Sequence, residues 1–276
     1  MELSFEDREA LLRAKLILEH PGLAARIGEI LGKPIEVGLN SLPARVQQAI
    51  GAATQAALQL GLHAAVSTLP VRPAAQSSTL HKWVGGLAGA AGGFFGVLAL
   101  PAELPLSTLI ILRAIAAIAC SEGEDMRLME ARLACLEVLG LGSTTRPRND
   151  GNGAETAYYA ARIGLAQSVT RAAEYITQHG LATKAAPPVA ELLTRIAARF
   201  SMRVTEEVIA KAVPVVGAAS GAAINALFIH HFQEMARAHF TIRRLERTYG
   251  AEPIQRVYER LEWRYSGIGP GPAASA

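Results

Sequence analysis

The feature that most constrains this chain is a run of twenty residues, Trp83 to Ala102, that contains six glycines and no charged residue. About twenty apolar residues are enough to cross the hydrocarbon of a membrane as a helix. However, each glycine in a helix interior costs about 1 kcal/mol relative to alanine, and the strongly apolar residues favour insertion by only about 2 to 4 kcal/mol. Two interpretations of this run therefore stay open: a helix of a soluble core, and a segment that inserts into lipid.

The glycines of this run are spaced as on one face of a helix. They recur at intervals of four, three and four residues, and a second uncharged run, 212–229, contains two more glycines four residues apart. Residues at such intervals share one side of a helix, and a glycine face lets a second backbone approach closely. We therefore predict a glycine-faced helical hairpin at the centre of the fold. The glycines expected to pack helices are Gly85, Gly89, Gly92, Gly96, Gly217 and Gly221.

Nearly every segment of the chain has helical periodicity, and strand signals are almost absent. Charged residues make up 18% of the chain, against about a quarter in soluble proteins, which indicates a large interior or a contact with lipid. We predict an all-α fold, a single multi-helix domain over residues 1–265 followed by a disordered tail, 266–276. The expected helices are Ser4–His20, a short helix ending at Leu31, Leu42–Leu69, Glu103–Ser121, Glu124–Leu139, Ala154–His179, Pro188–Lys211, Pro214–Tyr249 and Glu252–Arg264.

Three polar residues within or beside apolar segments form a predicted polar centre: Glu103, Arg113 and Asn225. Glu103 is expected at the start of a helix, where unpaired amide groups and the helix dipole stabilise a carboxylate. Arg113 lies about 15 Å further along the helix axis, so it needs another partner. Because a buried polar group without partners costs about 1 to 3 kcal/mol, we hypothesise an internal network of Arg113, Asn225 and an acid such as Glu155 or Glu234.

Charge and cysteine content bear on partners and compartment. The net charge is +3, and acidic and basic residues are interspersed, so the chain lacks the basic patch of a nucleic-acid-binding protein. Two cysteines, Cys120 and Cys135, in a chain of this size indicate reduced thiols. The acidic, amphipathic N-terminus lacks the pattern of a secretory signal. We expect a cytoplasmic protein, and peripheral contact with the inner membrane or partial insertion into it stays open.

Motifs of catalysis and of cofactor binding are not found. The segment Gly28–Pro34 has the wrong spacing for a phosphate-binding loop, and a proline stands where the magnesium-binding Ser or Thr belongs. The cluster His230, His231, Glu234 and His239 matches neither the zinc spacing nor the di-iron spacing. We therefore predict no cofactor and no metal, and the sequence identifies no catalytic residue.

Four segments carry a family resemblance: ALPAELPLSTLIILRAIAAIA (99–119), ETAYYAARIGLAQSV (155–169), VVGAASGAAINALF (215–228) and AHFTIRRLERTYG (238–250). Their acid-x-Pro step, their glycine stretch ending in Asn and their Arg-Arg-Leu-Glu run closing at Tyr-Gly resemble the EcsC family of bacterial proteins. The resemblance is strongest over residues 80–250. The positions that match the family pattern are Glu103, Arg113, Gly217, Gly221, Asn225, Arg243, Arg244 and Gly250.

The founding member of that family is encoded beside an ATP-binding cassette exporter, so the resemblance implies a context of membrane transport or secretion. It implies no catalytic residue. We expect a non-enzymatic accessory protein whose partner is the membrane surface or a membrane protein such as a transporter. The alternative is a lipid carrier or a lipid-acting enzyme, in which an apolar pocket holds an acyl chain and Arg113, Asn225 or His231 contacts the head group.

Overall fold

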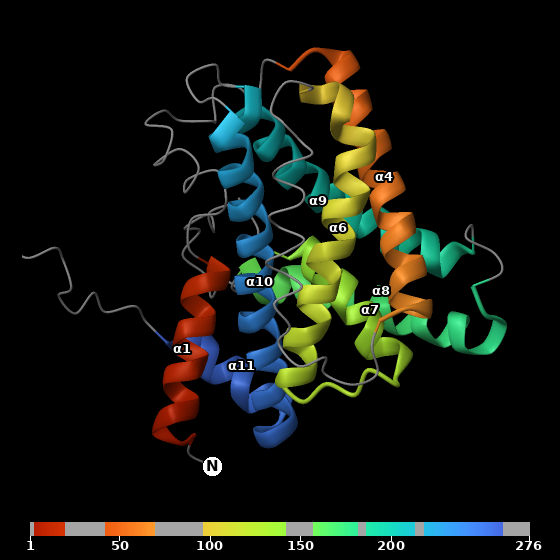
Figure 1. Cartoon of the computed structure of the whole chain (residues 1–276). Coiled ribbons are helices and arrows are strands. Elements are labelled where there is room, and N and C mark those ends of the chain that lie inside the picture. The colour runs from red at the N-terminus through yellow and green to blue at the C-terminus, as the bar shows by residue number, and fades with distance from the viewer. Residues whose placement is uncertain are drawn as a thin grey trace, which may run out of the picture.

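The computed structural model describes residues 3–19, 42–69, 96–141, 157–181, 186–212 and 218–261. Within these ranges the chain forms eight α-helices and no strand (Figure 1), which confirms the predicted all-α fold. The helices are α1 (Phe5–Glu19), α4 (Ala44–Ser67), α6 (Gly96–Ser121), α7 (Met129–Glu137), α8 (Ala157–His179), α9 (Pro187–Ala212), α10 (Ala218–Tyr249) and α11 (Ala251–Arg260), and a 3-10 turn, η1 (Val138–Gly140), follows α7.

Helix ends lie where capping residues were expected. The Asp7 amide donates to Ser4 Oγ at 3.1 Å, and the Ser4 hydroxyl donates to the Asp7 carboxylate at 2.9 Å, which fixes the first turn of α1. Gly180 and Gly250 have φ angles of +70° and +92°, a region that glycine enters without steric cost. Each donates its amide at 2.8 Å to a carbonyl four residues earlier. These glycines therefore end α8 and α10 as predicted.

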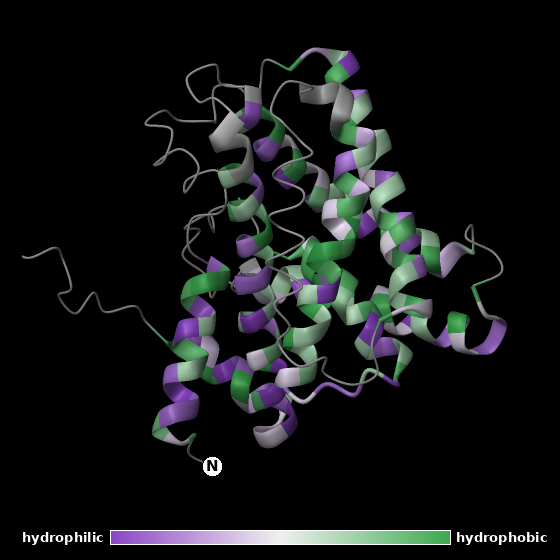
Figure 2. Cartoon of the chain, in the orientation of Figure 1, coloured by the Kyte–Doolittle hydropathy of each residue, from purple (hydrophilic) through white to green (hydrophobic). Residues whose placement is uncertain are grey.

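The helices surround one hydrophobic core. Helices α4, α6 and α10 run roughly alongside one another, α9 crosses behind them, and α1 and α11 lie beside the lower half of α10 (Figure 1). Hydrophilic residues are concentrated on α1, on α11 and on the lower half of α10, whereas the pair of α4 and α6 is mostly hydrophobic (Figure 2). The lower half of α10 is therefore the part of this long helix where charged side chains gather.

The first part of α6 departs from the expected boundaries. We expected one apolar segment to end near Pro101 and a new helix to begin at Glu103, but α6 runs without a break from Gly96 to Ser121 and contains Pro101 and Pro105. Both prolines lie beyond the first turn of α6, so each removes one intrahelical hydrogen bond. Glu103 is thus inside a helix, and the predicted stabilisation of its carboxylate at a helix start is wrong.

Close packing at glycine occurs between α4 and its neighbours. A Cβ atom added to Gly61 would lie 2.8 Å from Leu112 Cδ1 and 3.3 Å from Leu136 Cδ2. The glycine therefore lets α4 approach both α6 and α7. Of the glycines predicted to pack helices, Gly85, Gly89, Gly92 and Gly217 lie outside the described residues, and Gly96 and Gly221 are helical but their surroundings are not described. The predicted glycine-faced hairpin stays a prediction.

Candidate functional site

Charged residues on the lower half of α10 connect this helix to three other parts of the fold. Arg243 donates to both oxygens of Glu124, at 2.8 and 3.1 Å, in the segment between α6 and α7. Arg244 donates to Glu122 at 2.9 Å and to Asp7 of α1 at 3.3 Å. We call these charged residues of α10, together with the residues of opposite charge that they bind, the α10 ion-pair hub. Its α10 members are Arg243, Arg244, Glu246 and Arg247.

The strongest pair of the hub joins α8 to α10. Arg162 donates through both terminal nitrogens to the two oxygens of Glu246, each at 2.6 Å, and the two side chains are only 15% and 11% exposed. The Arg162 guanidinium also lies 5.9 Å from the ring centre of Tyr158 and 5.8 Å from that of Tyr159. A bidentate pair fixes geometry as well as energy, and the ring contacts add cation–π attraction. The position of α8 on α10 is therefore closely specified.

A tyrosine and a histidine extend this contact into the core. Tyr158 Oη and His239 Nδ1 share a hydrogen bond of 2.9 Å, and both side chains are buried. Burial lowers the pKa of His239 well below its ordinary value, and the positive charges of Arg162 and Arg243 lower it further. His239 is thus neutral at pH 7. Its Nε2 atom is buried and makes no hydrogen bond to any described residue.

Glu137, the last residue of α7, is a buried acid that lies near Arg162 and Arg243 but lacks hydrogen bonds from the described residues to one of its carboxylate oxygens. It is 1% exposed, and its Oε1 atom has no hydrogen-bond partner in the described part of the chain. Burial raises the pKa of Glu137 to about 7, although Arg162 and Arg243 oppose the shift. Glu207 of α9 is as deeply buried but forms an ion pair with Lys211 at 2.8 Å. Glu137 therefore differs from Glu207 because no cation among the described residues forms an ion pair with it.

These residues form one buried polar cluster between α7, α8 and α10, which consists of Glu137, Tyr158, Arg162, His239, Arg243 and Glu246. Apart from Glu137, each member makes a hydrogen bond or an ion pair. Such an arrangement can hold helices in register, and through Glu137 it can bind and release a proton near neutral pH.

A second charged group connects α6 to α9. Lys211 donates to Glu103 at 2.5 Å and lies 2.8 Å from Glu207. Burial raises the pKa of Glu207, and the charge of Lys211 opposes this. One cation thus neutralises two partly or fully buried acids, and this contact holds the C-terminal end of α9 against α6.

The predicted polar centre is not assembled as hypothesised. Glu103 binds Lys211, and Asn225 is 8% exposed with an Oδ1 atom that lacks a hydrogen-bond partner among the residues described. Arg113, in contrast, is exposed on the side of α6 that also exposes Leu106 and Ala117. An internal network that includes Arg113 is therefore wrong, because residues seven before and four after it face outward on the same side of the helix.

The two acids suggested for that network also lie elsewhere or outside the described residues. Glu155 is outside them, and Glu234 lies 3.5 Å from His230, its neighbour one turn earlier on α10. Within the described ranges no group of three or more His, Cys, Asp or Glu side chains is arranged to hold a metal ion.

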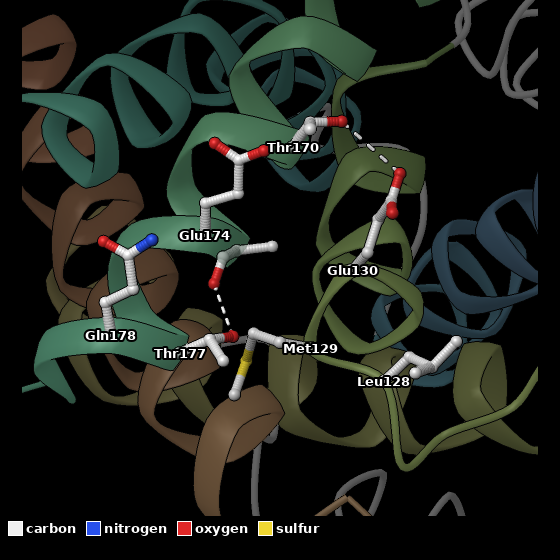
Figure 3. Close-up of a pocket in the computed structure, with 8 residues that line it drawn as sticks. Leu128, Met129, Glu130, Thr170, Glu174, Thr177 and Gln178 are labelled. Atoms are coloured by element: carbon white, nitrogen blue, oxygen red, sulfur yellow. Dashed lines mark hydrogen bonds between the residues drawn. The ribbon is translucent and has the colours of Figure 1, made fainter.

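A surface pocket of about 330 Å³ lies between the start of α7 and α8 (Figure 3). Glu130 and Glu174 stand on its two sides, and the Thr170 hydroxyl donates to Glu130 at 3.4 Å. An acyl chain in this pocket would cover the two carboxylates of Glu130 and Glu174, and burying a charge against apolar groups costs free energy. The complete lining is Leu128, Met129, Glu130, Thr170, Ala173, Glu174, Thr177 and Gln178.

Sequence reasoning missed three residues of these sites: Glu137, Arg162 and Lys211. Glu137 and Arg162 are single charged residues whose neighbours one turn away are apolar, and this pattern is the available signal for a buried charge. Lys211 follows Glu207 by four residues, which is the spacing of an ion pair along one helix. Arg243 and Arg244 were recognised as part of the family pattern, but their partners lie about 120 residues away or more, as for Arg243 and Glu124.

The fold and its sites define an all-α protein whose longest helix is anchored by buried and half-buried ion pairs. The EcsC protein family matches residues 7–245, and the chain belongs to this family. The match confirms the resemblance found in the four sequence segments and extends it to the N-terminal region. No curated protein and no solved structure matches the chain.

Proposed function

We propose that this chain is a non-enzymatic accessory protein that binds at the cytoplasmic face of the membrane, on the lipid surface or on a membrane protein of a transport or secretion system. The observation that supports it best is α6. Within Leu100–Ser121 the most apolar window of 18 residues has a mean hydropathy of 1.9, so this helix is apolar and long enough for a membrane span, yet only 56% of that window is buried inside the protein.

The exposed side of α6 suits contact with a membrane surface better than complete insertion. Leu106 is 40% exposed, and Arg113 lies on the same side. An arginine at this position can keep its charge among anionic head groups while its aliphatic stem lies on apolar surface. Complete insertion would instead separate α6 from α4 and break the ion pair between Glu103 and Lys211. Peripheral binding is therefore the form that we propose.

The alternative function, a lipid carrier or lipid-acting enzyme, requires an apolar pocket for an acyl chain. The pocket between α7 and α8 gives it no support, because acids and hydroxyls line it. Native mass spectrometry of the purified protein would test this alternative, because a lipid carrier is expected to copurify with a bound lipid.

The first prediction concerns binding to vesicles that contain anionic lipid. Leu106→Glu places a negative charge on the exposed side of α6, and we expect it to lower the fraction of protein that cosediments with these vesicles at least fivefold. Ile163→Glu is the matched control, because Ile163 is 44% exposed, as Leu106 is 40%, and lies on α8, which packs against α7 and α9.

Equal loss of binding in both variants, or no cosedimentation of the unchanged protein, would contradict the proposal. Fractionation of cells adds a second criterion. A peripheral protein leaves the membrane fraction in high salt or carbonate, whereas an inserted one stays.

A further inference from the structure

Both cations of the buried polar cluster bind an acid other than Glu137. Arg162 is fully engaged with Glu246, and Arg243 binds both oxygens of Glu124. Glu137 is the third acid, and it is the most deeply buried of the three at 1% exposure. If Glu137 were ionised, no cation among the described residues would be bound to it, because Arg162 binds Glu246 and Arg243 binds Glu124. The cation of Arg247 also binds Glu124, but its side chain is 42% exposed and is largely screened by water.

Arg162 is the cation for which an ionised Glu137 would compete. Its positive charge is the largest opposing influence on the pKa of Glu137, and Arg243 is the next. A negative charge on Glu246 acts on Glu137 in the other direction. The charges of Glu137 and Glu246 therefore both act on the same guanidinium, which in the structure binds Glu246 alone of these two acids.

We propose that Glu137 is a buried proton-binding site that controls how firmly α8 is held on α10. With the proton bound, Glu137 is neutral and Arg162 is left to Glu246. When the proton leaves, the additional negative charge draws Arg162 away from Glu246 and loosens the junction of the two helices. This effect of Glu137 protonation is independent of the proposed membrane binding, since Glu137 lies in the core and the effect requires no other molecule.

Among the described residues, the other charged groups near α7 do not form an ion pair with Glu137. Helix α7 packs against α8, α4, α6 and η1. The titratable residues of α4 and the arginine of α6 are exposed, Glu103 is paired with Lys211, and Cys120 is half-buried with a raised pKa caused by burial. On α9, Arg199 donates to the carbonyl of Gly140 at 3.4 Å. The groups that interact electrostatically with Glu137 are thus Tyr158 and Arg162 from α8, Arg243 and Glu246 from α10, and Glu130 from α7 itself.

The direction of the pH effect follows from the raised pKa. Burial holds the pKa of Glu137 at about 7, against an ordinary value of 4.5. A locally opened state that hydrates Glu137 loses the proton at the ordinary value, so opening becomes easier as the pH rises through 7. Between pH 6 and pH 8 these two values predict an increase of about tenfold in the opening equilibrium.

Hydrogen–deuterium exchange of the full chain at pH 6 and pH 8, corrected for the intrinsic exchange rate, tests this second prediction. In the unchanged protein we expect peptides from α8, residues 158–176, to exchange about tenfold faster at pH 8 relative to the corrected rate. Glu137→Gln, which is neutral at every pH, should abolish this increase. Glu259→Gln is the control, because Glu259 is exposed on α11 and accepts a hydrogen bond from Gln255 of its own helix, and it should leave the increase unchanged.

A spectroscopic measurement keeps the test valid if Glu137→Gln folds poorly. The carboxyl carbon of Glu137, observed by NMR in the unchanged protein, should titrate near pH 7. Titration near pH 4.5 would overturn the proposal. It would also be overturned if α8 showed no pH-dependent exchange, or if the well-folded Glu137→Gln variant kept the tenfold change.

Discussion

At the scale of single residues, the contacts of Arg162 show why one charged side chain can matter more than many on the surface. It binds a carboxylate through two hydrogen bonds and lies beside two tyrosine rings, all at low exposure. Removing one partner of a buried pair leaves the other charge without compensation, which costs about 3 to 5 kcal/mol. An exposed pair contributes about 0 to 1 kcal/mol.

The third prediction uses this difference. Arg162→Met leaves Glu246 in a mostly buried position without its cation, and we expect the free energy of unfolding to fall by about 3 kcal/mol. Arg171→Met on the same helix removes a pair with Glu191 whose arginine is 61% exposed, so it should change the free energy by less than about 1 kcal/mol. Denaturation in urea at pH 7 measures both. Similar losses in the two variants would show that burial of the pair is not what stabilises α8.

At the scale of elements, most helices could be predicted from the sequence because their ends carry local signals. Ser4, Gly180 and Gly250 act on backbone groups within four residues, and such contacts can be read from a short stretch of sequence. The beginning of α6 could not be predicted from such local signals, because Pro101 and Pro105 usually mark the boundary of a helix. In the folded protein, packing against α4 and α10 and the ion pair of Glu103 with Lys211 hold this helix together across both prolines.

The fourth prediction compares two glycines of α4. A Cβ atom at Gly51 would meet nothing within 4 Å, whereas at Gly61 it would lie 2.8 Å from a buried leucine methyl group. Gly51→Ala should therefore stabilise the protein by up to about 1 kcal/mol through helix propensity. Gly61→Ala gains the same helix propensity, but its methyl group must displace the side chains of Leu112 and Leu136 from α4. Such overpacking costs about 1 to 3 kcal/mol.

We thus expect Gly61→Ala to be less stable than Gly51→Ala by about 1 to 3 kcal/mol in chemical denaturation. If the two variants are equally stable, α4 does not approach α6 and α7 as closely as the structure shows.

At the scale of the whole molecule, the assembly rests on contacts that connect distant parts of the sequence. Lys15 of α1 donates to the carbonyls of Tyr258 and Leu261, at 2.6 and 3.0 Å. Asp7 accepts a hydrogen bond from Tyr249 at 2.7 Å and binds Arg244. Such partners cannot be inferred from one sequence, because nothing in the periodicity of a helix tells which distant charge it will meet. For the same reason the sequence indicated the family and its Arg-Arg-Leu-Glu run but not the ion-pair hub.

The last prediction follows from Asp7, which joins the N-terminal helix to the C-terminal end of α10. The hydrogen bond from Tyr249 lowers the pKa of Asp7, and those from Ser4 and Arg244 lower it further. A carboxyl group with a lowered pKa in the folded state stabilises that state above its ordinary pKa, and the contribution is lost as the pH falls through the folded value. Acidification below about pH 4 should therefore release α1 from α10.

Hydrogen–deuterium exchange of residues 5–18 at pH 6 and pH 3 would reveal this release as a loss of protection in α1, after correction for the intrinsic rate. Asp7→Asn lacks the charge at both pH values, so its α1 should exchange faster than that of the unchanged protein already at pH 6 and should change less on acidification. Glu9→Gln is the control, since Glu9 pairs only with Arg13 within α1 among the contacts described, and its side chain is 51% exposed. If Asp7→Asn behaves like Glu9→Gln, then the packing of Leu11 and Leu18, and not the charge of Asp7, holds the two ends of the described fold together.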